Sequence, residues 1–308
     1  MAMNIVPLTT LASDGVLVWK REAGTIGLLR NAQVVWQFNF GTNATKPFFH
    51  PVALPNGPVL TWNQPADHPW HHGLWFSWKF INGINYWEED PKTGLSNGQT
   101  SWREPQIETR PDFSARIVMD INYHPATNGQ VVLTEHRVID ISPPNNDGAY
   151  HQDWKMTFAA GGENVLLDRT PLPSEPGGQS WGGYAGLSVR LAAGITDPQA
   201  MTTHEPVKFT NGNYRSPAMA MDYTGSFEGF EAGIAILDWP SNLNSPSPWY
   251  AINGNPMHYF SPAVLCFQPQ TLKAGQQLTL RYRVIVHPGR WTVEQLRQAS
   301  EHYTTVKP

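Results

Sequence analysis

The sequence predicts an all-β protein, a large sandwich of two broad antiparallel sheets with one short helix at its carboxyl-terminal end. Short strand-like runs recur along the whole 308-residue chain, turn residues separate them, and helical spacing follows only after residue 292. The composition agrees with this prediction. Charged residues make up 15%, below the roughly 25% usual for soluble domains, while 26 glycines and 27 prolines suit many short strands joined by tight turns.

The strand-like runs either alternate apolar and polar residues or form short apolar blocks. They cover residues 15–20, 32–40, 71–80, 114–124, 130–141, 153–160, 186–192, 233–239, 263–270 and 277–287. In the last run, Leu280, Tyr282 and Val284 share one face and Arg281 and Arg283 the other. A period of two indicates a strand that is buried on one side.

Turn signals separate these runs. They are PNG at 55–57, NG at 82–83, 128–129, 211–212 and 253–254, PPNNDG at 143–148 and KAGQ at 273–276. They are typical of hairpin turns and loops. The stretch 161–183 is a long loop, and long loops in compact domains are often functional. No Pro/Ser/Gly-rich linker divides the chain, so residues 1–308 are interpreted as one domain, with two smaller sandwiches as the alternative.

The carboxyl-terminal helix is expected over about residues 292–303. Thr292 and Gln295 form a T-x-x-Q capping box, and Leu296, Ala299 and Tyr303 follow at helical spacing. This is the only segment of the chain for which the pattern predicts a helix.

Charge and hydropathy exclude several classes of function. The net charge is −4 without a basic tract, so nucleic-acid binding is not expected. No run approaches the roughly 20 apolar residues of a membrane helix. Residues 1–15 lack the features of a signal peptide, which favours the cytoplasm, although a periplasmic chain whose signal had been removed would look the same. The single cysteine, Cys266, excludes an intrachain disulfide and is interpreted as a buried small apolar residue.

The stretch ADHPWHHGLWFSW, residues 66–78, holds three histidines, one aspartate and three tryptophans. Pro69 excludes a regular helix here. If a strand begins near His71, then His71 and His72 point to opposite faces. A bound divalent metal ion is one interpretation, and it would need a distant ligand such as His50, His151 or His258.

Ligand contact and acid–base chemistry are the second interpretation, and an aromatic corner of the core is the third. Histidine exchanges protons near neutral pH and hydrogen-bonds hydroxyl groups. Trp70, Trp75 and Trp78 would offer apolar faces with an N–H donor. Carbohydrates present apolar C–H faces ringed by hydroxyls, so His68, His71 and His72 beside these indoles favour a sugar site.

Six segments together resemble a group of soluble bacterial proteins labelled PmoA-like or "methane oxygenase PmoA". They are KPFFHPV (46–52), DHPWHHGLWFSW (67–78), GINYWEE (83–89), DRTPLP (168–173), WGGYAGLSVRL (181–191) and LTLRYRVIVHPG (278–289). Where those proteins commonly read DHPHHRGLW, Trp70 and His72 replace a histidine and an arginine. The membrane methane oxygenase is helical and spans the bilayer, so methane oxidation is excluded for this chain.

Residues 263–284, AVLCFQPQTLKAGQQLTLRYRV, resemble the closing strands of the aldose 1-epimerases. That resemblance implies a galactose mutarotase-like β-supersandwich with a sugar site on its concave sheet. It also places Gln268 where those enzymes carry a catalytic glutamate. An amide cannot accept a proton in that role. The resemblance therefore favours the fold and not the mutarotase reaction.

Further polar residues in apolar surroundings are candidates for ligand contact. Arg190 interrupts the apolar run GLSVRL, where a cation needs a buried carboxylate or a ligand. Tyr184 follows two glycines that permit close approach of the backbone. The other candidates are Arg169 in DRTP, Glu88 after Tyr86–Trp87, His151 in YHQDW and His258 before YFSP.

The sequence thus predicts a carbohydrate-processing isomerase, epimerase or lyase that uses histidine-assisted proton transfer on a sugar or keto-sugar derivative. His71, His72 and His151 are the predicted catalytic residues. Ten residues are predicted to contact the substrate: His50, His68, Trp75, Trp78, Glu88, Arg169, Tyr184, Arg190, His258 and Gln268. Two alternatives stay open, a non-catalytic carbohydrate-binding protein and a metal-dependent glycoside or ester hydrolase.

Overall fold

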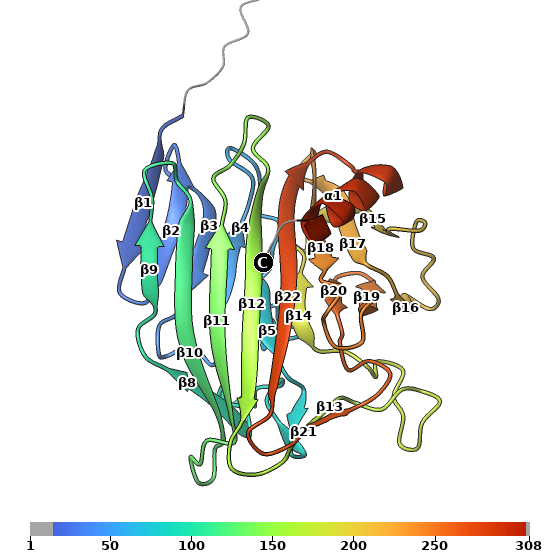
Figure 1. The fold of residues 1–308 in the computed structure, drawn as a ribbon. Coiled ribbons are helices and arrows are strands. Elements are labelled where there is room, and N and C mark those ends of the chain that lie inside the picture. Colours follow the sequence, from blue (N-terminus) through green and yellow to red (C-terminus); the bar gives the residue numbers. More distant parts are fainter. Residues whose placement is uncertain (1–14, 306–308) are drawn as a thin grey trace, which may run out of the picture.

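A computed structural model describes residues 15–305 as two nine-stranded sheets that lie face to face, with a small sheet at one end and one helix (Figure 1). All strand pairs within these sheets are antiparallel. The predicted all-β sandwich with one short carboxyl-terminal helix is confirmed. The prediction about a signal peptide concerns residues 1–15, of which 1–14 lie outside the described part.

The first sheet has the strand order β1-β2-β3-β4-β5-β14-β20-β19-β16. Its strands are β1 (Leu17–Glu22), β2 (Thr25–Arg30), β3 (Gln33–Asn39), β4 (Phe48–Val52), β5 (Leu74–Ser77), β14 (Gly186–Arg190), β20 (His258–Pro262), β19 (Pro248–Asn253) and β16 (Asn213–Pro217). The centre of this sheet therefore joins segments that are far apart in the sequence.

The second sheet has the order β15-β17-β18-β22-β12-β11-β10-β8, and β9 also pairs with β10. Its strands are β15 (Ile195–Thr202), β17 (Ala220–Phe227), β18 (Phe230–Asp238), β22 (Gln277–Pro288), β12 (Tyr150–Ala160), β11 (Leu133–Ile141), β10 (Ala115–Pro125), β8 (Gly98–Trp102) and β9 (Gln106–Thr109). The long pairing of β12 with β22 runs from Tyr150 opposite Val286 to Ala159 opposite Gln277.

A third, four-stranded sheet lies at one end of the sandwich (Figure 1). It contains β21 (Gln270–Leu272), β13 (Val165–Asp168), β6 (Phe80–Ile81) and β7 (Ile84–Asn85). The turn between β6 and β7 is the predicted Asn82–Gly83 pair, with φ of 51° and 76°. Two successive positive φ angles are what a two-residue type I′ hairpin requires.

The main core fills the space between the two large sheets. On β22, Leu280, Tyr282 and Val284 are fully buried in it, as their period of two predicts. Side chains of opposite sheets meet there: the rings of Phe49 on β4 and Trp154 on β12 have centroids 5.6 Å apart. Interdigitation of this kind holds the two sheets at a fixed spacing and leaves their outer faces free for other roles.

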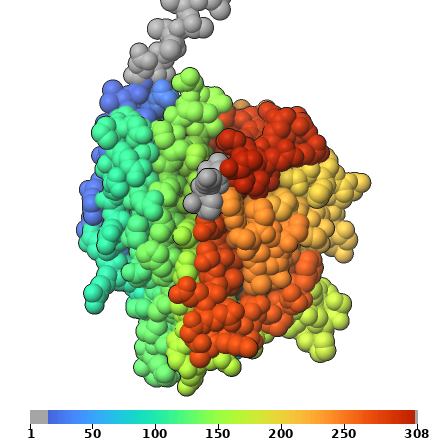
Figure 2. All heavy atoms as spheres, in the orientation of Figure 1, coloured from blue at the N-terminus to red at the C-terminus, as the bar shows by residue number. Residues whose placement is uncertain are grey.

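Helix α1 (Val293–Thr305) covers part of the outer face of the second sheet, where Figure 2 shows it as a ridge on the surface. The predicted capping box is present. The Thr292 amide donates to Gln295 Oε1 at 2.8 Å, and the Gln295 amide donates to Thr292 Oγ1 at 3.2 Å. Leu296 and Tyr303 are buried against β17 and β18. Among residues 15–305, no helix is both long and apolar enough to cross a membrane.

The strand predicted over residues 263–270 is not formed. Residues 263–269 are turns and irregular backbone, and only Gln270 belongs to a strand, β21. Its apolar residues are nevertheless buried: Cys266 packs so closely under Gly183 that a side chain on that glycine would meet the Cys266 sulfur. A short apolar run reports burial and does not by itself distinguish a strand from a buried loop. The interpretation of Cys266 as a buried apolar residue is confirmed.

Candidate functional site

Strand alternation divides the side chains of the first sheet between two faces. On β5, Leu74 and Phe76 enter the main core, whereas Trp75 points to the outer face. On β20, Phe260 enters the core and Tyr259 points outward, and Tyr250 does the same on β19. The outer face of this sheet therefore carries a second aromatic cluster, separate from the sandwich core.

A cavity of about 330 Å³ opens within this cluster. We call it the aromatic cavity. Six aromatic side chains line it: Trp70, Trp87, Trp181, Tyr184, Tyr250 and Tyr259. Two histidines and one glutamate line it as well: His68, His71 and Glu88. Of the predicted site residues, the structure thus brings His68, His71, Glu88 and Tyr184 together from three loops.

His71 is a neutral hydrogen-bond donor at the wall of this cavity. Burial, followed by electrostatic interactions with His68 and Arg190, holds the pKa of His71 well below its usual range. Arg190 Nη1 lies 3.5 Å from His71 Nδ1. Because a guanidinium stays protonated, Nδ1 must present its lone pair, and the imidazole proton sits on Nε2. Nε2 has no hydrogen-bond partner within residues 15–305 and is not an enclosed atom.

An ion pair behind the cavity holds the histidine loop in place. Arg190, fully buried on β14, donates from Nη2 to both carboxylate oxygens of Asp67 at 2.9 and 2.7 Å. Asp67 Oδ2 also lies 2.9 Å from His68 Nδ1. The His68 and His71 rings stack with centroids 4.7 Å apart. Arg190 therefore positions Asp67 and the two imidazoles and is not itself among the residues that line the cavity.

Glu88 supplies a carboxylate to the same cavity. Tyr184 donates its hydroxyl proton to Glu88 Oε1 at 2.6 Å, and Asn85 Nδ2 donates to Oε2 at 2.7 Å. Lys79 forms an ion pair with Oε2. Burial alone would raise the pKa of Glu88, but the charge and hydrogen bond of Lys79 outweigh it and lower the pKa. The group is therefore an ionised acceptor at neutral pH.

Trp181 is the exposed member of the aromatic set. The long loop predicted over residues 161–183 contains strand β13, and Trp181 belongs to the part that follows this strand. Of its surface, 53% is accessible although it lines the cavity. Arg215 fixes this loop by donating to the backbone carbonyls of Gly182 at 2.9 Å and Ser180 at 2.6 Å. An indole with one free face thus stands at the mouth of the cavity.

His72 faces a different cavity from its neighbour His71. Its Nε2 lies 3.0 Å from Glu89 Oε1, and both residues line a second space of about 560 Å³, which we call the polar cavity. The predicted strand does not begin at His71, since β5 begins at Leu74. The two histidines are nevertheless separated: His71 lines the aromatic cavity and His72 the polar cavity.

The structure separates His151 and Gln268 from the aromatic cavity. His151 lies on β12 in the second sheet, 3.9 Å from Asp153, so it cannot be the partner of His71. Gln268 is exposed and donates to Asn244 Oδ1 at 3.0 Å. The predicted hollow shared by the histidine stretch and Gln268 is not formed, because residues 263–269 are turns and irregular backbone and not a strand that crosses the site.

Five other predicted contact residues also lie outside this cavity. Trp75 is buried beneath it, with its ring centroid 5.1 Å from that of His71, and Trp78 is in the sandwich core. His50 lies 3.0 Å from Thr61 Oγ1 and His258 lies 3.1 Å from the Tyr223 hydroxyl. Arg169 is buried in ion pairs with Asp168 and Glu175.

Sequence reasoning missed most of the aromatic wall. Trp87, Trp181, Tyr250 and Tyr259 were not predicted as site residues, although all four line the cavity. A signal for two of them was available, since Trp87 and Trp181 lie in the GINYWEE and WGGY segments. The two tyrosines could not be assigned without knowing which face of the sheet each strand residue occupies.

The predicted divalent metal ion finds no ligand set in the described structure. Within residues 15–305, no group of three or more histidine, cysteine, aspartate or glutamate side chains is arranged to hold a metal ion. Within residues 66–78, Asp67 pairs with Arg190 and His72 with Glu89, so these two proposed ligands already have other partners.

Two comparisons with known proteins bear on this chain. No curated protein matches the sequence. Residues 25–301 match the model of a family described as a family of unknown function, DUF6807. That match covers every strand of the two large sheets except β1, and every residue of the aromatic cavity. The chain belongs to the DUF6807 family.

Proposed function

We propose that the aromatic cavity binds a carbohydrate or a sugar-derived small molecule and that the protein acts on it by proton transfer. The observation that carries the proposal is the half-exposed Trp181 indole above a cavity that holds an ionised carboxylate, Glu88, and a neutral imidazole donor, His71. The C–H face of a sugar would stack on the indole. Its hydroxyls would donate to Glu88 and accept from His71.

The same groups suit the chemistry of an isomerase, epimerase or lyase. Removal of a proton next to a carbonyl needs a base for the C–H and a donor that stabilises the oxygen. A neutral imidazole is such a donor, and a carboxylate is such a base. Glu88 therefore takes the place that His151 had in the sequence-based prediction, and His68 supplies a second imidazole beside His71.

Non-catalytic carbohydrate binding is the second candidate, and one observation favours it. Glu88 already accepts hydrogen bonds from Tyr184 and Asn85 and pairs with Lys79, which lowers its pKa and weakens it as a base. A metal-dependent hydrolase is not proposed, because the described residues offer no metal ligand group. The resemblance to the aldose 1-epimerase supersandwich supports either sugar-related candidate, since that fold places its ligands on one face of a broad sheet.

Replacing the exposed indole tests sugar binding. We expect Trp181→Ala to weaken binding about tenfold, roughly 1.4 kcal/mol, because the stacking face is lost. Binding is measured by ligand-detected NMR against a panel of neutral monosaccharides and disaccharides. Phe230→Ala removes an aromatic ring that is 42% exposed on the second sheet and serves as the control. A wild-type protein that binds no saccharide in the panel overturns the proposal.

Isotope exchange decides between the two candidates. If the protein transfers protons, a saccharide that binds should take up deuterium at carbon when it is incubated with the protein in D₂O. We expect Glu88→Gln to abolish this exchange while binding is retained, since the amide accepts hydrogen bonds but not protons. Mass spectrometry of the recovered sugar measures the uptake. Absence of exchange with the wild-type protein leaves the binding function and removes the enzymatic one.

A further inference from the structure

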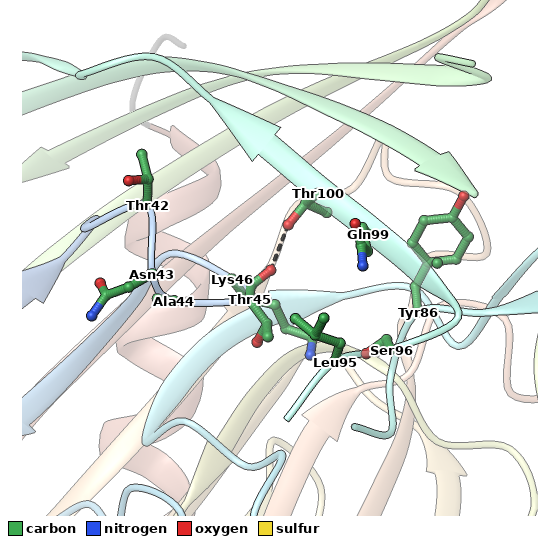
Figure 3. A pocket seen from close by; sticks show the side chains of 11 residues that line it. Thr42, Asn43, Ala44, Thr45, Lys46, Tyr86, Leu95, Ser96, Gln99 and Thr100 are labelled. Atoms are coloured by element: carbon green, nitrogen blue, oxygen red, sulfur yellow. Dashed lines mark hydrogen bonds between the residues drawn. The ribbon is translucent and has the colours of Figure 1, made fainter. Parts of the chain in front are cut away.

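The polar cavity is a second space on the outer face of the first sheet. Its volume is about 560 Å³, and it adjoins a hollow of about 150 Å³. Both spaces are lined by Asn43, Ala44 and Thr45 of one loop, together with Leu95. Figure 3 shows the smaller one, where Thr100 Oγ1 donates to the Thr45 carbonyl at 2.6 Å. That hydrogen bond fixes the loop between the two spaces.

Glu89 presents one free carboxylate oxygen to the polar cavity. Its Oε1 accepts hydrogen bonds from Lys46 Nζ at 2.7 Å, from His72 Nε2 at 3.0 Å and from the Thr45 hydroxyl. Its Oε2 accepts no hydrogen bond from residues 15–305. This oxygen is also not fully enclosed by the protein. The side chain is only 6% exposed and lines the cavity, so Oε2 is a buried acceptor that opens toward this space.

The surrounding charges keep Glu89 ionised. Burial alone would raise its pKa, but the hydrogen bond from His72 and the charge of Lys46 outweigh burial and bring the pKa to about 2. Lys46 is itself buried, and its Nζ also donates to the Trp87 carbonyl at 3.3 Å. The carboxylate is therefore fixed in position and cannot rotate Oε2 away without breaking several contacts.

The chemistry of the cavity wall selects a neutral polar ligand. The negative charge of Glu89 is compensated by Lys46, and the cavity is lined by no other aspartate or glutamate and by no arginine. Its remaining polar groups are amides and hydroxyls, including those of Asn43, Gln64 and Thr93. An anion would find no unpaired cation there. Fixed acceptors among amides and hydroxyls suit a group that offers several hydroxyls.

The two cavities are neighbours because consecutive residues divide between them. His71 and Glu88 line the aromatic cavity, while His72 and Glu89 line the polar cavity. Cα atoms of consecutive residues lie about 3.8 Å apart. The Trp75 ring packs against both imidazoles, with centroids 5.1 Å from His71 and 6.3 Å from His72.

We propose that the polar cavity binds a second neutral saccharide unit through Glu89 Oε2, so that the ligand of this protein contains at least two sugar residues. This inference rests on the proposed function of the aromatic cavity and specifies its substrate class. Gln64, an exposed residue at the edge of the polar cavity, belongs to the same set of contacts.

The test compares binding of a monosaccharide with binding of the disaccharide built from it. Binding constants are measured by titration calorimetry for glucose, mannose and xylose and for their β-1,4-linked disaccharides, cellobiose, mannobiose and xylobiose. We expect the wild-type protein to bind at least one disaccharide ten or more times as tightly as its monosaccharide. Gln64→Ala should reduce this ratio at least threefold, and Glu89→Gln should bring it close to one. Gln130→Ala, an exposed glutamine that lines none of these cavities, should leave the ratio unchanged.

The possible outcomes distinguish failure of the second subsite from failure of the proposed sugar-binding function. Equal affinity for monosaccharide and disaccharide, with both weakened by Trp181→Ala, overturns the second subsite and keeps the sugar function. A disaccharide preference that Gln64→Ala leaves intact also overturns it. If Glu89→Gln does not fold because Lys46 has lost its ion-pair partner, Gln64→Ala still tests the second subsite. Failure of the wild-type protein to bind any of the six sugars rejects the proposed function and the subsite together.

Discussion

Arg190 shows how one buried cation organises the aromatic cavity without lining it. Its side chain is fully buried, whereas Asp67, its partner, is 27% exposed. Because Asp67 also contacts His68, loss of the guanidinium would release the loop that carries both imidazoles. Removal of one partner from a buried ion pair leaves the other charge uncompensated. The free energy of unfolding therefore falls by more than it does when an exposed pair is broken.

We therefore expect Arg190→Gln to lower the free energy of unfolding by about 2 kcal/mol or more. Urea denaturation followed by tryptophan fluorescence measures the change. Arg116→Gln is the matched control, because Arg116 pairs with Asp140 on the second sheet where both side chains are 43% exposed. An exposed pair contributes at most about 1 kcal/mol. Equal losses in the two variants would contradict the positioning role of Arg190.

At the scale of single residues, the sequence predicted part of the site. His68, His71, Glu88 and Tyr184 were singled out and do line one cavity. The sequence could not decide between His71 and His72, because their orientation depends on how the loop enters β5. Nor could it place Gln268, whose role depended on a strand that does not form.

At the scale of elements, the sequence predicted best those strands that are buried on one face. The long strands β10, β11, β12 and β22 alternate, and their predicted runs end within a few residues of the observed bounds. The central strands of the first sheet do not alternate, since β5, β14 and β20 are buried at every position. The core covers one side of them and the aromatic cluster the other.

This double burial explains why the site was harder to predict than the fold. A strand that is buried on both faces has a continuous apolar pattern, which resembles any other apolar run. Residues 258–262 and 248–253 were not predicted as strands, and they carry Tyr259 and Tyr250 of the cavity. In this fold the strands that form the site are thus the ones whose sequence pattern is least informative.

At the scale of the whole molecule, buried histidines link stability to pH. Burial is the largest cause that lowers the pKa of His50, His71, His72 and His258, and it brings the pKa of His50 to about 4. In the unfolded chain each would titrate near 6.5. Below that pH the unfolded state therefore binds more protons than the folded state, and the free energy of unfolding must fall as the solution is acidified.

We expect the free energy of unfolding to decrease steadily from pH 7 to pH 4, with a slope of up to about 1.4 kcal/mol per pH unit for each histidine that stays neutral. Below about pH 4.5 the decrease should continue, because Glu89 has a folded pKa of about 2 and its contribution is lost as it becomes protonated. Urea unfolding at pH 7, 6, 5 and 4 measures the profile.

His50→Gln, which keeps a polar group beside Thr61, should remove one histidine's share of the slope between pH 6.5 and 4. A free energy of unfolding that is the same at pH 7 and pH 5 would mean that these histidines accept protons without loss of the fold, and that the network around the two cavities opens to water far more readily than its burial indicates.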